Sequence, residues 1–159
     1  MAFELRSDDI VDARLGLHHA LNGFGHRGEN VSPQLAWGDP PEGTKSLALT
    51  MFDPDPASDS GFWHWLVVDL PAGTRELTQA AGAPGGDLPA GAVQTLTDFG
   101  APGYHGPAPS PGQTNTYRFR LHALSVERLD VEPGSTGGYV SMMINADSIA
   151  RATLEATYP

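Results

Sequence analysis

Residues 51–56 read Met-Phe-Asp-Pro-Asp-Pro, and residues 62–68 read Phe-Trp-His-Trp-Leu-Val-Val. Each proline fixes its own φ and keeps the preceding residue extended, so Asp53 and Asp55 lie on a stiff backbone. The second stretch is bulky and β-favouring, which predicts a strand buried on both faces. His64 interrupts it. This histidine is either a core imidazole satisfied by one hydrogen bond or, beside the two carboxylates, part of a site that binds an ion or transfers a proton.

The rest of the chain follows an all-β pattern. The stretch 117–124 alternates apolar residues with Arg118, Arg120 and His122, which predicts a strand with one buried face. Residues 137–150 carry apolar side chains at helical spacing, and residues 77–92 form the longest predicted loop. With no repeat or domain break, residues 1–159 are predicted to form a single domain. Further strands are predicted at residues 35–37, 46–52, 62–70, 93–97 and 152–158.

Several short motifs, in register from about His18 to the C-terminus, resemble the phosphatidylethanolamine-binding proteins, which include Raf kinase inhibitor protein. The likeness is to their short bacterial members. The motifs, besides the two stretches above, are Asn-Gly-Phe-Gly at 22–25, Asn-Val-Ser-Pro-Gln-Leu-Ala-Trp at 30–37, Gln-Thr at 94–95, Thr-Asp-Phe-Gly at 97–100 and Tyr-His-Gly-Pro-Ala-Pro at 104–109.

The resemblance implies a mainly β fold, a β-sandwich with a late short helix and a small ligand pocket at one end. The family binds phosphate, acetate or a phospholipid head group there. Asp53, His64 and Tyr117 match the pocket positions of the family. The motif at 104–109, with His105, Gly106 and Pro107, matches the rim loop, and Asp55 is expected beside Asp53.

Three positions depart from the family pattern. Asn115 and Thr116 replace a histidine and an arginine, and Asp147 replaces a late-helix histidine of bacterial relatives. By strand alternation Asn115 shares the pocket face with Tyr117, so a potential cation is lost and anion affinity is expected to fall. Asp147 either adds a carboxylate near the pocket or lies at the edge of the helix face, where it reaches solvent or pairs with Arg151.

Thr116 points away from the pocket, where the family's arginine could pair with an aspartate. Arg118 or Arg120, on the same face, is expected to substitute for it. The adjacent histidines His18 and His19 cannot chelate one ion from a strand and are interpreted as surface or loop residues.

Composition excludes several classes of protein and site. The chain has no cysteine, so disulfides, thiolate catalysis and zinc–thiolate sites are ruled out. A calcium loop starting at Asp53 fails because Ala57 and Ser58 occupy positions that need a ligand and a glycine, and no metal or other cofactor is expected. The formal net charge of −10 disfavours nucleic acid. Neither a signal peptide nor a membrane span is recognisable, so we expect a cytoplasmic protein, and bacterial relatives imply a homodimer.

Three functions remain open from the sequence. The first is binding of a small ligand, either a polar head group or an anion, at Asp53, His64 and Tyr117. The second is a cofactor-free enzyme for cyclisation, condensation or isomerisation, with Asp53 or His64 as base, Tyr117 as acid and Asn115 as donor to an oxyanion. The third, also present in the family, is inhibition of a kinase or protease.

Overall fold

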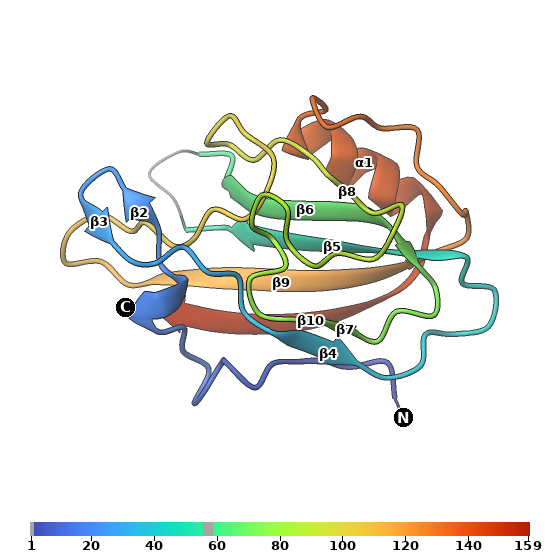
Figure 1. Ribbon diagram of the computed structural model, residues 1–159, viewed down its shortest axis with the longest axis horizontal. Helices are drawn as coiled ribbons and strands as arrows, with labels where there is room; N and C mark the ends of the chain where they lie inside the picture. Colours follow the sequence, from blue (N-terminus) through green and yellow to red (C-terminus); the bar gives the residue numbers. More distant parts are fainter. Residues whose placement is uncertain (1, 56–58) are drawn as a thin grey trace.

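Five antiparallel strands form the main sheet in the computed structural model, which describes residues 2–55 and 59–159 (Figure 1). Their order across the sheet is β10-β9-β5-β6-β8. Pro56, Ala57 and Ser58 lie outside the described residues, so the second proline of the Asp-Pro-Asp-Pro motif and the rejected calcium positions are not placed. The strands are β5 (Ser46–Asp53), β6 (Phe62–Pro71), β8 (Val93–Gln94), β9 (Asn115–Leu124) and β10 (Ser148–Tyr158).

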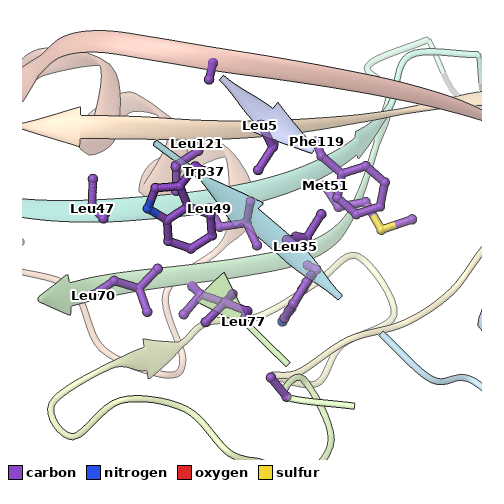
Figure 2. Packing of buried hydrophobic residues seen from close by; sticks show 14 of the residues in the cluster. Leu5, Leu35, Trp37, Leu47, Leu49, Met51, Leu70, Leu77, Phe119 and Leu121 are labelled. Carbon is purple, nitrogen blue, oxygen red and sulfur yellow. The ribbon is translucent and has the colours of Figure 1, made fainter. Parts of the chain in front are cut away.

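A smaller sheet covers one face of the main sheet, as expected for a β-sandwich. It consists of β1 (Leu5–Arg6), β4 (Leu35–Trp37) and β7 (Glu76–Leu77) in the order β1-β4-β7. Figure 2 shows the core between the two sheets, where leucines of β4 and β7 face those of β5, β6 and β9. Leu35, Leu49 and Leu121 are fully buried there.

The helix α1 (Gly137–Asp147) covers part of the opposite face of the main sheet. Thr136 caps its first turn by accepting a hydrogen bond from the Tyr139 N–H. Val140 and Ile144 pack with sheet residues Ala48, Leu66, Val68 and Leu124 in a second apolar cluster. Since both faces are covered, β5 and the centre of β6 are buried on both sides, which confirms the pattern expected for residues 62–68.

The predicted fold class is confirmed, and several predicted element boundaries need correction, among them the start of β9, which is Asn115 and not residue 117. The strand expected at 93–97 ends at Gln94, because the Leu96 N–H donates to the Ser135 carbonyl rather than to a neighbouring strand. The helix expected to reach residue 150 ends at Asp147, and β10 begins at once. Arg151 therefore lies in a strand, and a helical pair between Asp147 and Arg151 does not form.

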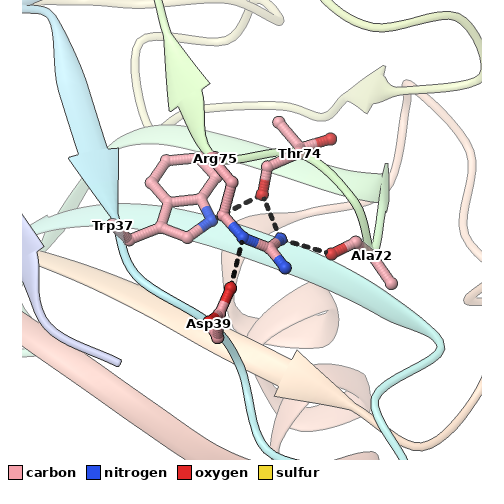
Figure 3. Close-up of polar contacts among 5 residues, drawn as sticks. All are labelled: Trp37, Asp39, Ala72, Thr74 and Arg75. Carbon is pink, nitrogen blue, oxygen red and sulfur yellow. Dashed lines mark hydrogen bonds and ion pairs between the residues drawn. The ribbon is translucent and has the colours of Figure 1, made fainter. Parts of the chain in front are cut away.

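Short elements that the sequence did not predict join the loops to the sandwich. A hairpin of β2 (Asn22–Gly23) and β3 (His26–Arg27) follows the 3₁₀ turn Leu17–His19. Near β4 and β7, the Arg75 guanidinium donates to the carbonyls of Ala72 and Thr74 and to Asp39, while the Trp37 indole N–H donates to the Thr74 carbonyl (Figure 3). These contacts hold the turn after β6 against the small sheet.

Candidate functional site

A cavity of about 470 Å³ opens at the end of the main sheet where β5 and β6 meet the start of β9. We call it the end cavity. Asp53 is the last residue of β5, Phe62 the first of β6 and Asn115 the first of β9, so three neighbouring strands contribute to it. The end cavity is lined by Phe24, His26, Asp53, Phe62, His64, Phe99, Ala108, Pro109, Ser110, Pro111, Gln113 and Asn115.

Asp53 is nearly buried and tightly held. Its Oδ1 accepts a hydrogen bond of 2.7 Å from the Asp55 N–H, and its Oδ2 accepts one of 2.9 Å from the Asn115 amide. Burial raises the pKa of Asp53, and these two hydrogen bonds counter only part of that effect. Asn115 thus occupies the expected pocket side of β9 and donates to the carboxylate.

His64 is also buried, and its orientation is fixed by the rim loop. Its Nδ1–H donates to the His105 carbonyl at 2.7 Å, and the His105 N–H donates back to the His64 carbonyl at 2.9 Å. Burial lowers the pKa of His64 to about 4. At neutral pH the imidazole is therefore uncharged, with the proton on Nδ1 and an acceptor lone pair on Nε2.

Aromatic rings surround the two polar groups. Phe62 lies with its ring centre 4.8 Å from that of Phe99 and 5.1 Å from that of His64. Phe24, at the tip of the β2–β3 hairpin, is 87% exposed and approaches Phe99 at 5.9 Å. The end cavity thus combines polar groups at the strand ends with aromatic rings from β6 and from the loops, a combination typical of small-ligand sites.

The rim loop makes structural contacts at the three positions expected to bind ligand. His105 is half-buried, hydrogen-bonds Thr97 through Nδ1 at 2.9 Å and stacks on Phe99. Burial lowers the pKa of His105. The Gly106 N–H donates to the Asn30 side chain at 2.7 Å, and the Pro107 carbonyl accepts from the Leu21 N–H. His105, Gly106 and Pro107 support the site without lining the end cavity.

Tyr117 lies behind the end cavity instead of lining it. Its ring meets His64 edge to face at 5.3 Å, and the side chain is fully buried in the core between the sheets. Its hydroxyl has no hydrogen-bond partner of good geometry among the described residues. Burial, reinforced by Asp53, raises the pKa of Tyr117, so the hydroxyl stays protonated.

Asp55 and Asp147 are not brought into the end cavity. Asp55 is exposed, and its Oδ2 accepts the Thr116 N–H at 3.1 Å, which fixes the start of β9. Asp147 lies at the far end of the same strand, where its carbonyl accepts the Ser125 N–H. Ten residues of β9 separate the two ends, roughly 30 Å at the rise of a strand. The expectation that Asp147 adds a carboxylate to the pocket is therefore wrong.

His19 also differs from its expected surface or loop role. It is buried, and its Nδ1–H donates to the Val31 carbonyl at 2.7 Å, while its own carbonyl accepts the Tyr104 hydroxyl. His18 is exposed beside Glu29, as expected of a surface residue.

The aromatic and rim residues that line the end cavity were missed as site residues, although several lie within the motifs quoted above. Phe62 has the same strand parity as His64, which was a usable signal. Phe24, Phe99 and Gln113 come from loops whose approach depends on tertiary packing.

Within residues 2–55 and 59–159, no group of three or more His, Cys, Asp or Glu side chains is placed to hold a metal ion. The same residues include no helix of sufficient length and apolarity to span a membrane.

Comparison with known proteins agrees with this architecture. Residues 12–159 match the family model described as phosphatidylethanolamine-binding protein. The chain is 46% identical to YbhB of Escherichia coli, over 98% of this chain and 99% of the relative. It is also similar to the crystal structure of YbcL from the same organism, titled a new member of the mammalian PEBP family, with a TM-score of 0.95 and 42% identity over 99% of this chain and 98% of that one.

A second solved structure is more distant. A putative phosphatidylethanolamine-binding protein homologue from Chlamydia trachomatis superposes with a TM-score of 0.83 and 30% identity, covering 99% of this chain and 97% of the other. The shared fold thus extends over nearly the whole chain.

Proposed function

This chain belongs to the phosphatidylethanolamine-binding protein family, and from that premise we propose that it binds a small ligand through a polar head group in the end cavity. The side chains that face the head group are Asp53, His64 and Asn115. Phe24, Phe62 and Phe99 contact the part of the ligand that follows.

The observation that carries this proposal is the hydrogen-bonding character of the polar side. His64 is neutral at pH 7 and offers Nε2 as an acceptor, because its Nδ1–H is used by the His105 carbonyl. Asp53 offers carboxylate oxygens. The Asn115 amide already donates to Asp53. The site therefore offers mainly acceptors.

This arrangement favours a head group that donates hydrogen bonds. An ammonium, hydroxyl or amide N–H can pair with Asp53 and His64, and a cation also gains from the faces of the nearby phenylalanines. A phosphate or acetate would instead meet a buried carboxylate without a compensating cation. This direction agrees with the loss of a histidine at position 115.

Titration calorimetry with ethanolamine, phosphate and acetate at pH 7 tests the proposal. We expect ethanolamine to bind the wild type more tightly than either anion, and Asp53→Asn to weaken ethanolamine by about tenfold or more, since a charge-assisted hydrogen bond is lost. Asn115→His should improve phosphate binding. Asp147→Asn, at the other end of β9, is the matched control and should change none of these affinities.

Two outcomes would contradict the proposal. One is that the wild type binds phosphate tightly and that Asp53→Asn binds phosphate no more tightly than the wild type. The other is equal ethanolamine affinity in the wild type and Asp53→Asn.

Acid–base catalysis in the same cavity is a second candidate, favoured by one observation. Burial raises the pKa of Asp53 and lowers that of His64 to about 4, so both groups depart from their ordinary values in one cavity. Titratable groups perturbed in this way are candidates for proton transfer with a bound substrate. Tyr117, expected as the acid, does not line the cavity, so Asp53 and His64 are the groups on which this candidate depends.

The enzyme and the binding protein differ in how Asp53→Asn and His64→Gln act. For an enzyme, single-turnover rates with a candidate substrate should fall by about 10²-fold or more in each variant, while substrate affinity changes less. A binding protein shows affinity changes alone, with no product formed by the wild type.

A further inference from the structure

A second cavity, of about 210 Å³, lies on the opposite face of the main sheet, between the strands and α1. We call it the cationic cavity. It shares no lining residue with the end cavity, because alternate residues of β5, β6 and β9 point to opposite faces. The cationic cavity is lined by Thr50, Phe52, Trp63, Arg118, Arg120, His122, Ser141, Ile144 and Asn145.

The registers of the strands gather positive charge at this cavity. Arg118, Arg120 and His122 alternate along one face of β9, and Arg151 of β10 lies directly opposite His122. The chain has 9 lysines and arginines in all and a net charge of −10, and three of those nine are Arg118, Arg120 and Arg151. A cluster of cations in an otherwise acidic protein requires a local explanation.

Among the described residues, Arg118 is the one of these arginines with a direct ion pair to a carboxylate, and the same Glu155 also lies near Arg120. Arg118 donates through Nε to Glu155 of β10 at 3.0 Å, so the aspartate pairing expected for it from the sequence does not occur. Arg120 faces Thr50 on one neighbouring strand and Thr153 on the other. Its Nε is buried and has no hydrogen-bond partner among the described residues. A buried guanidinium nitrogen without a hydrogen-bond partner is costly and requires an explanation, of which a bound ion or water is one.

Neighbouring positive charges surround Arg120, so an anion bound there would be favoured electrostatically. Burial, and after it the nearby Arg151 and Arg118, lowers the pKa of Arg120. The same causes, burial first and then Arg151 and Arg120, lower the pKa of His122 to about 4. His122 is therefore neutral at pH 7, with Nδ1 hydrogen-bonded to the Ser148 hydroxyl. The positive charge at the cavity resides in the arginines. Among the described residues, Glu155 is the carboxylate that lies close to Arg118 and Arg120.

We propose that the cationic cavity binds a small oxyanion, a phosphoryl or carboxylate group carried on an apolar or aromatic moiety. The oxyanion pairs with Arg120 and Arg118, and the guanidinium fork suits such groups. Ser141 and Asn145 of α1 supply further polar contacts from above. The apolar moiety lies against Phe52, Trp63 and Ile144. This site is separate from the head-group site and does not depend on the function proposed for it.

Trp63 provides a direct readout, because it lines the cationic cavity whereas Trp37 and Trp65 are buried in the core between the sheets. Phenyl phosphate, benzoate and inorganic phosphate are titrated separately while tryptophan fluorescence is followed. We expect a saturable change with phenyl phosphate or benzoate, weaker binding of inorganic phosphate, and loss of the signal in Trp63→Phe. The first two probes decide which oxyanion the site prefers.

Two arginine variants locate the binding. Arg120→Gln should weaken the better probe by about tenfold or more, as expected for loss of a hydrogen bond between charged groups. Arg6→Gln removes the same charge from an exposed position on β1 and should leave the affinity within about twofold. Equal effects of the two variants would mean non-specific attraction and overturn the proposal. Tighter binding in Asp53→Asn with no loss in Arg120→Gln would place the anion in the end cavity, beside the removed carboxylate, and also overturn it.

Thermal unfolding keeps the test decisive if Arg120→Gln alters the fold. Without an anion, Arg120→Gln should unfold at the same or a higher temperature than the wild type, because it removes a poorly satisfied charge. A saturating probe should raise the midpoint of the wild type and of Arg6→Gln, and not that of Arg120→Gln. Arg120→Lys, which keeps the charge, should retain part of the rise. No rise in the wild type, or the same rise in all variants, would refute the site.

Discussion

His64 and His122 lie on opposite faces of the main sheet, and burial keeps both uncharged at neutral pH. Their settings differ. His64 is held by a backbone carbonyl and lines the end cavity together with Asp53, whereas His122 lies beside arginines. One residue type thus serves an acceptor-rich site on one face and a cation-rich site on the other.

Asp53→Asn is expected to stabilise the protein at pH 7. The folded-state pKa of Asp53 is raised, so the carboxyl favours folding below its unfolded pKa and this contribution is lost as pH rises through the folded pKa. An amide carries no such penalty. Urea unfolding at pH 7 and at pH 3 measures the effect, and the advantage of Asn should shrink at the lower pH. A variant less stable than wild type at both values would contradict this expectation.

Individual site residues differed in how far the sequence could reveal them. Asp53, His64 and Asn115 were predictable, because strand ends and strand parity determine where they point. Phe24 and Phe99 were not predictable as lining residues, because loop packing alone brings them together. Asp147 was misplaced because its pocket role rested on the family resemblance alone, whereas the helix ends there, at the far end of β9 from the end cavity.

At the scale of elements, the rim loop is held against the segment that precedes β2. Asn30, which follows β3, joins them: its side chain accepts the Gly106 N–H and donates to the Tyr104 carbonyl at 3.0 Å, and its backbone N–H donates to the Ala20 carbonyl. A Cβ added at Gly106 would lie 2.1 Å from the His19 carbonyl oxygen. Glycine is therefore required there by the close approach of two backbones.

Gly106→Ala is expected to cost about 1–3 kcal/mol of unfolding free energy, as overpacking usually does, and more if the loop cannot shift. Because the rim loop supplies the carbonyl that orients His64, ligand affinity at the end cavity should fall as well. Chemical denaturation and calorimetry measure the two effects. Gly134→Ala, where an added Cβ meets nothing within 4 Å, is the matched control and should be near neutral. A stability change at Gly106 no larger than at Gly134 would rule out the steric argument.

Strand parity also explains which elements the sequence predicted well. Long strands such as β5, β6 and β9 were found because their burial patterns are strong over eight or ten residues. The two-residue strands β1, β2, β3 and β7 were missed. A pair of residues carries too little periodicity to be distinguished from a loop.

At the scale of the whole molecule, the buried histidines predict acid sensitivity. Both have a folded pKa of about 4 against an ordinary value of 6.5. Above pH 6.5 the histidine is neutral in both the folded and the unfolded protein, and its burial does not lower the free energy of unfolding. As pH falls from 6.5 toward 4, the unfolded protein takes up a proton that the folded protein does not, and the free energy of unfolding falls by up to about 3 kcal/mol for each histidine. Asp53, whose pKa is raised in the folded protein, instead increases the free energy of unfolding as pH falls through the acidic part of this range.

Urea unfolding at pH 7 and pH 5 tests this dependence. The wild type should lose stability on acidification, and His122→Gln should lose less, by about 1–2 kcal/mol from the linkage of one histidine. His18→Gln, at an exposed position, serves as the comparison for a histidine outside the core. Identical losses in the wild type and His122→Gln would show that His122 does not titrate in this way.

The main sheet carries one cavity on each of its faces, and β9 contributes to both in alternation. A substitution at Asn115 or Arg120 therefore alters the lining of one cavity and leaves the other intact, so the two cavities can diverge independently. A one-residue insertion or deletion within β9 has a different result, because it exchanges the faces of all residues beyond it. Arginines would enter the leucine core while Phe119 and Leu121 faced the helix. Related chains should therefore vary in length only outside this strand.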